Sequence, residues 1–312
     1  MLEKVDLTKK ISKEEYKAKM PQMEIELGRL QRECRELKIP VMIVFEGFGA
    51  SGKGVQIGKL IQSMDPRGFQ VFPIKAETED ERMHPFLWRF WTKTPEAGRI
   101  AIFDGSWYRK VLIDRFEKRT REKEIETAFH SIEAFEKQLT DGGTILVKLL
   151  LDIDQKEQKK RFEKLLEKKE TAWRVSQGDR ERNAKYSEYA AMMEEVLYRS
   201  DTKSAPWTVI EATDRRFATV KIYMTVIHAL AEAVEAVQRR RMEEQAIKAA
   251  EQVSGQQEAA EIMRQAGGEL EMLQSSVLSR ADLTLAYGKE EYEKRLKKLQ
   301  KKIEKLHGEV YR

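Results

Sequence analysis

A glycine-rich stretch near residue 50 has the residue types and spacing of a loop that holds phosphate. Gly47 and the pair Gly52–Lys53 form the pattern Gly-x-x-x-x-Gly-Lys. Glycines let the backbone wrap a phosphate with its N–H groups, and the lysine can reach the terminal phosphates. Lys53 is therefore the first catalytic candidate. The predicted phosphate-binding residues are Gly47, Gly49, Ala50, Ser51, Gly52, Lys53 and Gly54.

Magnesium (Mg2+) is the expected cofactor, but the loop lacks the usual ligand for it. A serine or threonine normally follows the lysine and binds magnesium, and Gly54 stands there instead. The metal must then be held elsewhere, or not at all. Asp104 ends an apolar run at what should be the ligand-binding edge of a sheet, and it is the candidate metal ligand and a catalytic candidate. It also suits the N-cap of a helix that begins near Trp107, and both roles are compatible.

Transfer of a phosphoryl group requires cations around the migrating group. Lys75 follows a predicted strand and is a candidate binding residue, and Arg109 follows another strand and is a candidate catalytic residue. The basic segment 169–185 has no clear period, so we expect it to be mobile and to form a lid, about 169–199, that closes over phosphates. A single lysine or arginine among the 58 usually belongs to a solvated face, and only the positions of Lys75, Arg109 and Arg174 at strand ends or in the lid favour a functional role. The lid candidates are Arg174 for catalysis and Arg180 and Arg182 for binding.

The elements that would position these residues are strands separated by helical segments. Such alternation is typical of an α/β fold with a mainly parallel sheet covered by helices on both faces. The apolar runs that predict strands are 41–45, 69–74, 99–104, 144–152 and 205–211. The predicted helices are 12–37, 53–64, 80–91, 107–116, 122–139, 154–168, a helix ending near 199, and 214–242.

Composition narrows the class of protein. The chain of 312 residues is 41% hydrophobic and 36% charged, with a net charge of +5. This modest excess fits an anionic ligand and does not require nucleic acid. Cys34 is the only cysteine, which excludes an internal disulfide and indicates a cytoplasmic location. No run approaches the about 20 apolar residues of a membrane span, so we expect no membrane partner.

The start of the chain is repeated near its end. Leu278-Ser-Arg-Ala-Asp-Leu-Thr284 resembles Leu2-Glu-Lys-Val-Asp-Leu-Thr8, and Lys289-Glu-Glu-Tyr292 resembles Lys13-Glu-Glu-Tyr16. The shared offset indicates a duplication, although two similar charged helices could also arise by chance. We expect a domain over 1–242, a linker over 243–276, and a truncated or decayed second copy over 277–312.

Further motifs match a known family. The chain resembles the type 2 polyphosphate kinases, and among them the two-domain polyphosphate:AMP phosphotransferases. The matching motifs are Glu46-Gly-x-x-x-x-Gly-Lys-Gly54, Lys75 with Glu77, His84-x-Phe-Leu-Trp-Arg89, Phe103-Asp-x-Ser-Trp-Tyr108, Phe135-Glu-x-x-Leu-x-x-Gly-Gly143, Glu157-Gln-x-x-Arg-Phe162 and Ala205-Pro-Trp207. The resemblance implies a three-layer P-loop kinase fold with a lid. It also implies magnesium and phosphate transfer between polyphosphate and a nucleotide, AMP or ADP.

Two departures from the family pattern leave a second function open. Gly49 stands where the family usually has an acid, and Gly105 stands where it usually has an arginine. Loss of a charge at a phosphoryl site can lower the rate about a hundredfold or more. The chain is then either an active phosphotransferase or a phosphate-binding or scaffolding half of a tandem enzyme. If the departures limit the rate, restoring Asp at 49 and Arg at 105 should raise it. Long helices and the family precedent suggest a homo-oligomer.

Overall fold

The computed structural model describes residues 2–265 and 288–310. The chain divides into two compact units, Met1–Ile247 and Lys248–Arg312. All the features of the site lie in the first unit.

The first unit is built on a five-stranded sheet with the order β2-β3-β1-β4-β5. The strands are β1 (Val41–Gly47), β2 (Phe69–Pro73), β3 (Ile100–Asp104), β4 (Ile145–Asp152) and β5 (Trp207–Glu211). Every neighbouring pair is parallel, which confirms the predicted α/β fold and all of its strands. Each strand of such a sheet needs a crossover connection to the next, and helices supply most of these connections.

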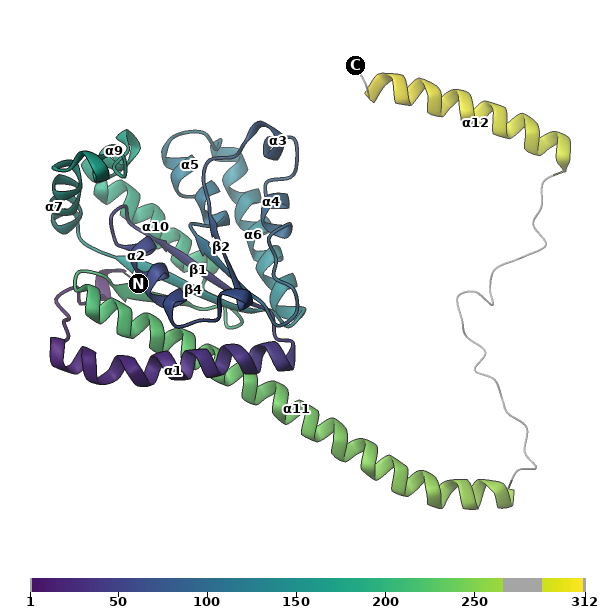
Figure 1. Ribbon diagram of the computed structural model, residues 1–312. Coiled ribbons are helices and arrows are strands. Elements are labelled where there is room, and N and C mark those ends of the chain that lie inside the picture. Colours follow the sequence, from purple (N-terminus) through teal and green to yellow (C-terminus); the bar gives the residue numbers. More distant parts are fainter. Residues whose placement is uncertain (1, 266–287, 311–312) are drawn as a thin grey trace. The chain divides into compact units, whose positions relative to one another are not determined.

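Helices cover both faces of the sheet, giving the expected three layers (Figure 1). Helices α1 (Lys13–Leu37), α2 (Lys53–Gln62) and α11 (Arg215–Gln265) lie on one face, where the Tyr223 hydroxyl of α11 donates to the carbonyl of Lys59 in α2. Helices α6 (Glu122–Asp141) and α10 (Tyr186–Ser200) lie on the other face, where Lys148 of β4 donates hydrogen bonds to both. The other longer helices are α7 (Gln155–Leu166), α9 (Gln177–Ala184) and α12 (Lys289–Val310). The short ones are η1 (Leu2–Lys4), η2 (Pro66–Gly68), α3 (Glu79–Arg82), α4 (Trp88–Trp91), η3 (Trp107–Lys110), α5 (Ile113–Phe116) and α8 (Lys169–Ala172).

Two predicted helices are broken into shorter pieces. Residues 80–91 form α3 and α4, with Pro85 between them. Proline has no N–H and disfavours helical geometry at the residue before it, so the helix cannot continue. Residues 107–116 likewise form η3 and α5. Ser106 is the N-cap of η3, so the capping role considered for Asp104 belongs to Ser106.

The segment 169–185, in which no helix or strand was predicted, is largely helical. It forms α8 and α9, and α9 begins with a capping box in which Ser176 and Asp179 satisfy each other's backbone N–H groups. The sequence Ser-x-x-Asp is a known signature of such a start. Lid closure by this segment stays a prediction.

Helix α11 extends far beyond its predicted end. It has 51 residues, so positions 243–265 are helical where a linker was expected. Its part Arg215–Ile247 is long and apolar enough to cross a membrane, contrary to the expectation for this chain, but 50% of its apolar stretch is buried inside the domain. Residues such as Tyr223, Val226 and Leu230 belong to the core, which is how a core helix meets the same criteria.

The repeated motif occupies the same kind of position in both copies. Lys13-Glu-Glu-Tyr16 begins α1, and Lys289-Glu-Glu-Tyr292 begins α12. The remaining part of the repeat, at 278–284, lies outside the described residues. The tandem arrangement itself stays a prediction.

Candidate active site

The glycine-rich loop joins the end of β1 to the start of α2. Gly47 and Gly52 have φ values of 135° and 107°, and Ala50 has a left-handed φ of 57°. Within the described part of the chain, no acceptor binds the backbone N–H groups of Gly52, Lys53 or Gly54. These groups can therefore bind an anion at the N-terminus of α2.

Side chains hold the carbonyl groups of the loop. Lys53 Nζ donates to the carbonyls of Gly47 at 2.9 Å and Phe48 at 3.4 Å. Gln158 of α7 donates to the carbonyl of Gly49 at 3.0 Å. The lysine is thus folded back on its own loop, and a bound phosphate would have to attract its ammonium group away from these carbonyls.

Asp104 and Glu46 end adjacent strands beside the loop. Asp104 is half-buried and pairs with Phe45 in the β1–β3 register. Glu46 is buried and accepts a hydrogen bond from the Ser106 hydroxyl at 2.7 Å. Burial raises the pKa of the Glu46 carboxyl, and the ammonium of Lys53 acts in the opposite direction. Sequence reasoning did not single out Glu46 as a site residue, although it opens the loop motif.

A cavity of about 860 Å³, called here the loop cavity, opens over the loop. Basic side chains dominate its lining, and Asp104 is its acidic residue. The basic residues are Lys53, Arg161, Lys164, Lys168, Arg174 and Arg215. Their crowding around exposed N–H groups gives a strongly positive site that suits a ligand with several negative charges.

Only some of the predicted cations reach this cavity. Arg174 lines it, with its guanidinium 5.4 Å from the ring centre of Trp173. Arg109 lies 3.3 Å from Asp114, and Arg182 is buried between Glu117 and Asp179, with ion-pair distances of 2.7 and 2.8 Å. Lys75 and Arg180 are exposed, and neither lines the loop cavity.

Four cations of the cavity were missed: Lys164, Lys168, Arg215 and Arg161. The first two lie three and seven positions after Arg161, so they fall on one face of α7 and its end. That spacing in a charged helix was the available signal. Arg215 begins α11 directly after the turn that follows β5, at the same carboxyl edge of the sheet.

Helix α9 occupies the space beside Gly49. A Cβ atom at this position would lie 3.0 Å from Asp179 Oδ1 and 3.1 Å from Phe162 Cζ. An aspartate here would require both side chains to move and would face another carboxylate. Gly105 has a φ of 75°, which strains any larger residue. Restoring Asp at 49 and Arg at 105 therefore does more than add two charges.

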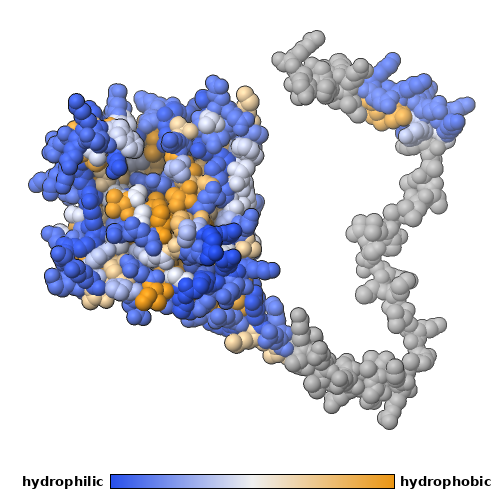
Figure 2. All heavy atoms as spheres, in the orientation of Figure 1, coloured by the Kyte–Doolittle hydropathy of each residue, from blue (hydrophilic) through white to orange (hydrophobic). Residues whose placement is uncertain are grey.

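A second cavity, of about 730 Å³, lies beside the segments that follow β2 and β3. Its cations include Arg82, Lys110 and Arg121, and Phe86 also lines it. Figure 1 shows that α3 and α5, which border this side, and α7, which borders the loop cavity, stand on opposite sides of the carboxyl edge. Figure 2 shows one side of this unit, which is largely hydrophilic, with hydrophobic residues gathered in its middle.

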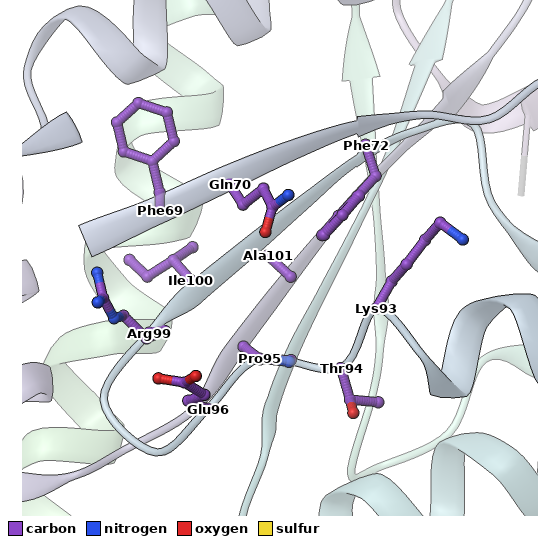
Figure 3. A pocket seen from close by; sticks show the side chains of 10 residues that line it. All are labelled: Phe69, Gln70, Phe72, Lys93, Thr94, Pro95, Glu96, Arg99, Ile100 and Ala101. Atoms are coloured by element: carbon purple, nitrogen blue, oxygen red, sulfur yellow. The ribbon is translucent and has the colours of Figure 1, made fainter. Parts of the chain in front are cut away.

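A smaller cavity of about 300 Å³ is unrelated to this edge (Figure 3). It is lined by the first residues of β2 and β3, such as Phe69 and Ile100, and by the connection that holds Lys93 and Glu96. It therefore lies toward the amino-terminal ends of the strands, away from the loop.

Asp152, at the carboxyl end of β4, is a buried acid that sequence reasoning did not single out. Burial, together with the neighbouring carboxylates of Asp154 and Glu211, raises its pKa to about 6. The usual value is 3.8. The unfolded chain therefore loses this proton first, and ionisation of Asp152 destabilises the folded protein as the pH rises from about 4 to about 6.

Asp152→Asn should remove this pH dependence. We expect the variant to be more stable than wild type at pH 7 by up to about 3 kcal/mol, with little difference at pH 4. Urea unfolding at both pH values measures the effect, and the exposed Asp141→Asn serves as control. If the difference in stability between Asp152→Asn and wild type does not grow from pH 4 to pH 7, the assignment is contradicted.

Comparison with known proteins identifies the family. Residues 10–242 match the family described as Polyphosphate kinase 2. A polyphosphate:AMP phosphotransferase of Pseudomonas syringae pv. tomato is 36% identical over 75% of this chain and 47% of its own length. An ADP-polyphosphate phosphotransferase of Rhizobium meliloti is 27% identical over 69% of this chain and 76% of its own length.

Solved structures agree. A polyphosphate kinase 2 structure from Arthrobacter aurescens has a TM-score of 0.70 at 30% identity and covers 74% of this chain and 85% of its own. One from Pseudomonas aeruginosa has a TM-score of 0.73 at 35% identity and covers 75% of this chain and 51% of its own. The chain spans about half the length of the polyphosphate:AMP phosphotransferases it matches. On this evidence the chain belongs to the polyphosphate kinase 2 family.

Proposed function

We propose that this protein transfers phosphate between polyphosphate and a nucleotide, AMP or ADP. The observation that carries the proposal is the loop cavity, where several cations and free backbone N–H groups surround a single acidic residue. Phosphoryl transfer depends mainly on positioning and charge stabilisation, and this cavity supplies both for a polyanion. The names of the similar proteins describe the same class of reaction.

The second cavity supports a reaction with two anionic substrates. It lies at the same edge of the sheet and combines cations with the aromatic ring of Phe86. The distance from Lys110 Nζ to the centre of this ring is 5.9 Å. Cations can bind a phosphate group, and an aromatic ring can pack against a base. A nucleotide in this cavity and polyphosphate over the loop would bring donor and acceptor together at Asp104 and Lys53.

Magnesium fits this site only in partnership with substrate. Among residues 2–265 and 288–310, no group of three or more His, Cys, Asp or Glu side chains is placed to hold a metal ion. Asp104 lines the loop cavity, and Ser51 Oγ is buried there without a hydrogen-bond partner in this part of the chain. Magnesium is often held by one or two carboxylates together with substrate phosphates and water. Asp104 would be its protein ligand, and the ion would neutralise phosphate charge.

A second function, phosphate binding without efficient catalysis, has specific support. The place of the loop acid is taken by glycine with α9 packed against it, and Arg109 and Arg182 are engaged by carboxylates. The cations that remain directed to the loop cavity still provide affinity for polyphosphate. In this case the protein would be the binding half of a larger tandem enzyme.

Lys53→Ala separates these functions. With polyphosphate, magnesium and AMP or ADP, the wild-type protein should form the nucleotide with one more phosphate, and the variant should be about a hundredfold slower or worse. Lys59→Ala, which removes an exposed lysine of α2, is the matched control. Product formation is followed by chromatography, and polyphosphate binding by calorimetry. If the wild-type protein binds polyphosphate but forms no product, the second function is favoured. If it neither binds polyphosphate nor forms product, both functions are excluded.

A further inference from the structure

Arg161 is the one basic residue of the loop cavity that is buried, and the protein itself uses all of its hydrogen-bonding capacity. Its Nη1 group donates to the carbonyls of Ala50 at 3.1 Å and Ser51 at 3.0 Å. Its Nη2 group donates to the carbonyls of Ala212 at 2.8 Å and Thr213 at 3.0 Å. A guanidinium has a fixed number of N–H groups in one plane, and both forks are filled.

The remaining N–H group of Arg161 is filled as well. Nε donates to Glu157 Oε1 at 2.7 Å, one turn earlier on α7. No N–H group of Arg161 is left for a phosphate, although its side chain lines the loop cavity. Arg174 differs, since it is exposed and its guanidinium lies over the ring of Trp173. The two arginines therefore have different relations to an anion in the cavity.

The bonds of Arg161 join two segments that are distant in sequence. Ala50 and Ser51 belong to the glycine-rich loop, whereas Ala212 and Thr213 form the turn between β5 and α11. Ala50 has a left-handed φ of 57°, which costs a residue with a Cβ about 1–2 kcal/mol. Such a conformation persists only where surrounding contacts hold it, and Arg161 contacts the carbonyl of this very residue.

We propose that Arg161 is a positioning residue that shapes the glycine-rich loop for anion binding without touching the anion. It holds the carbonyl oxygens of Ala50 and Ser51 away from the cavity, so that the free N–H groups of Gly52, Lys53 and Gly54 face the ligand. Carbonyl oxygens carry partial negative charge, and a loop that turned them inward would repel phosphate. The inference rests on the proposed binding of polyphosphate by this cavity.

Arg161→Lys tests the proposal because it keeps the charge and removes the planar fork. An ammonium is a compact point charge that cannot bond to carbonyls on both sides as the guanidinium does. We expect the variant to bind inorganic tripolyphosphate at least about tenfold more weakly, measured by calorimetry over a range of salt concentrations. The salt dependence should stay that of wild type, since no charge is lost. Wild-type affinity in Arg161→Lys would overturn the proposal.

Two further variants provide reference values for the affinity and for its salt dependence. Arg174→Met removes an exposed cation of the cavity and should lower both the affinity and its dependence on salt, as expected for a residue that pairs with phosphate. Lys159→Ala removes an exposed lysine from α7 outside the cavity and should leave binding unchanged. A lower salt dependence in Arg161→Lys, like that of Arg174→Met, would assign Arg161 to direct contact and overturn the proposal.

Hydrogen exchange of the ligand-free protein provides a readout that does not depend on the proposed function. In Arg161→Lys the amide of Ser51, which donates to the carbonyl of Phe48 at 3.1 Å, should exchange at least about tenfold faster, while the amides of β4 stay protected as in wild type. Equal acceleration in β4 would indicate a general loss of stability and overturn the positioning role. If wild-type protein fails to bind tripolyphosphate, the proposed function fails, and exchange in the loop still decides whether Arg161 shapes it.

Discussion

Gly47→Ala should destabilise the protein by about 4 kcal/mol or more and abolish binding of polyphosphate. A Cβ atom at this position would lie 2.2 Å from the carbonyl oxygen of Leu151, the residue opposite Gly47 in the β1–β4 pairing. The φ of 135° is also unfavourable for any residue with a side chain. The clashing atom belongs to the backbone of Leu151 and cannot rotate away as a side chain could. The clash can be removed only if the end of β1 separates from β4.

Gly58→Ala is the matched control, with an effect of opposite sign. Gly58 lies inside α2, and a Cβ there meets no other atom within 4 Å. Alanine favours a helix over glycine by about 0.5–1 kcal/mol, so this variant should be slightly more stable. Urea unfolding gives both free energies, and calorimetry with tripolyphosphate gives binding. A Gly47→Ala protein as stable as wild type would show that Gly47 does not have this backbone conformation and this close approach to Leu151.

Glu136→Ala should cost about 3–5 kcal/mol of folding free energy. Lys148 is fully buried, and its Nζ donates to Glu136 Oε2 at 2.8 Å and to the carbonyl of Ser200 at 2.6 Å. The other oxygen of Glu136 accepts from Trp107 Nε1 at 2.9 Å and from the Tyr108 hydroxyl at 2.5 Å. Removing the carboxylate leaves a buried ammonium without its counter-charge and leaves these donors unsatisfied.

The loss should depend on pH in a defined direction. Burial lowers the pKa of Lys148, and without Glu136 nothing nearby opposes that effect as strongly. A lysine with a folded pKa below its unfolded value stabilises the folded protein less as the pH falls, so the deficit of Glu136→Ala should shrink as the pH rises toward the pKa of free lysine. Glu133→Ala, on the exposed side of α6, should change stability by less than about 0.5 kcal/mol. A Glu136→Ala deficit under about 1 kcal/mol would contradict this account.

The strands were predictable because their signal is local. Each is a short apolar run, and Val41–Phe45 and Leu146–Leu151 are buried throughout, as expected for interior strands of a parallel sheet. The helix break at Pro85 and the helix start at Ser176 also have local sequence signals, a proline and the pattern Ser-x-x-Asp, but neither was used in the prediction. The far end of α11 could not be predicted from composition, because Glu, Gln and Ala suit a helix as well as a linker.

The site was predictable only in part, because its cations depend on contacts between distant segments. The loop and Asp104 follow from sequence spacing, and the structure brings them to one cavity. Arg182 was expected at phosphate and is instead held by Glu117, which lies far from it in sequence. The bonds of Arg161 to residues 50 and 212 likewise arise from the fold alone. In a chain with 58 lysines and arginines, sequence position does not show which of them face each other.

The order of strands in the sheet also determines when the glycine-rich loop can form as the chain is synthesised. β1 lies between β3 and β4, and both neighbours follow it in sequence. A nascent chain that has emerged only as far as α6 contains the whole loop, yet lacks the Leu151 backbone that pairs with Gly47. Pairing between distant strands is slow, since the intervening chain must be ordered first. The shape of the loop is therefore acquired late, after most of the domain has left the ribosome.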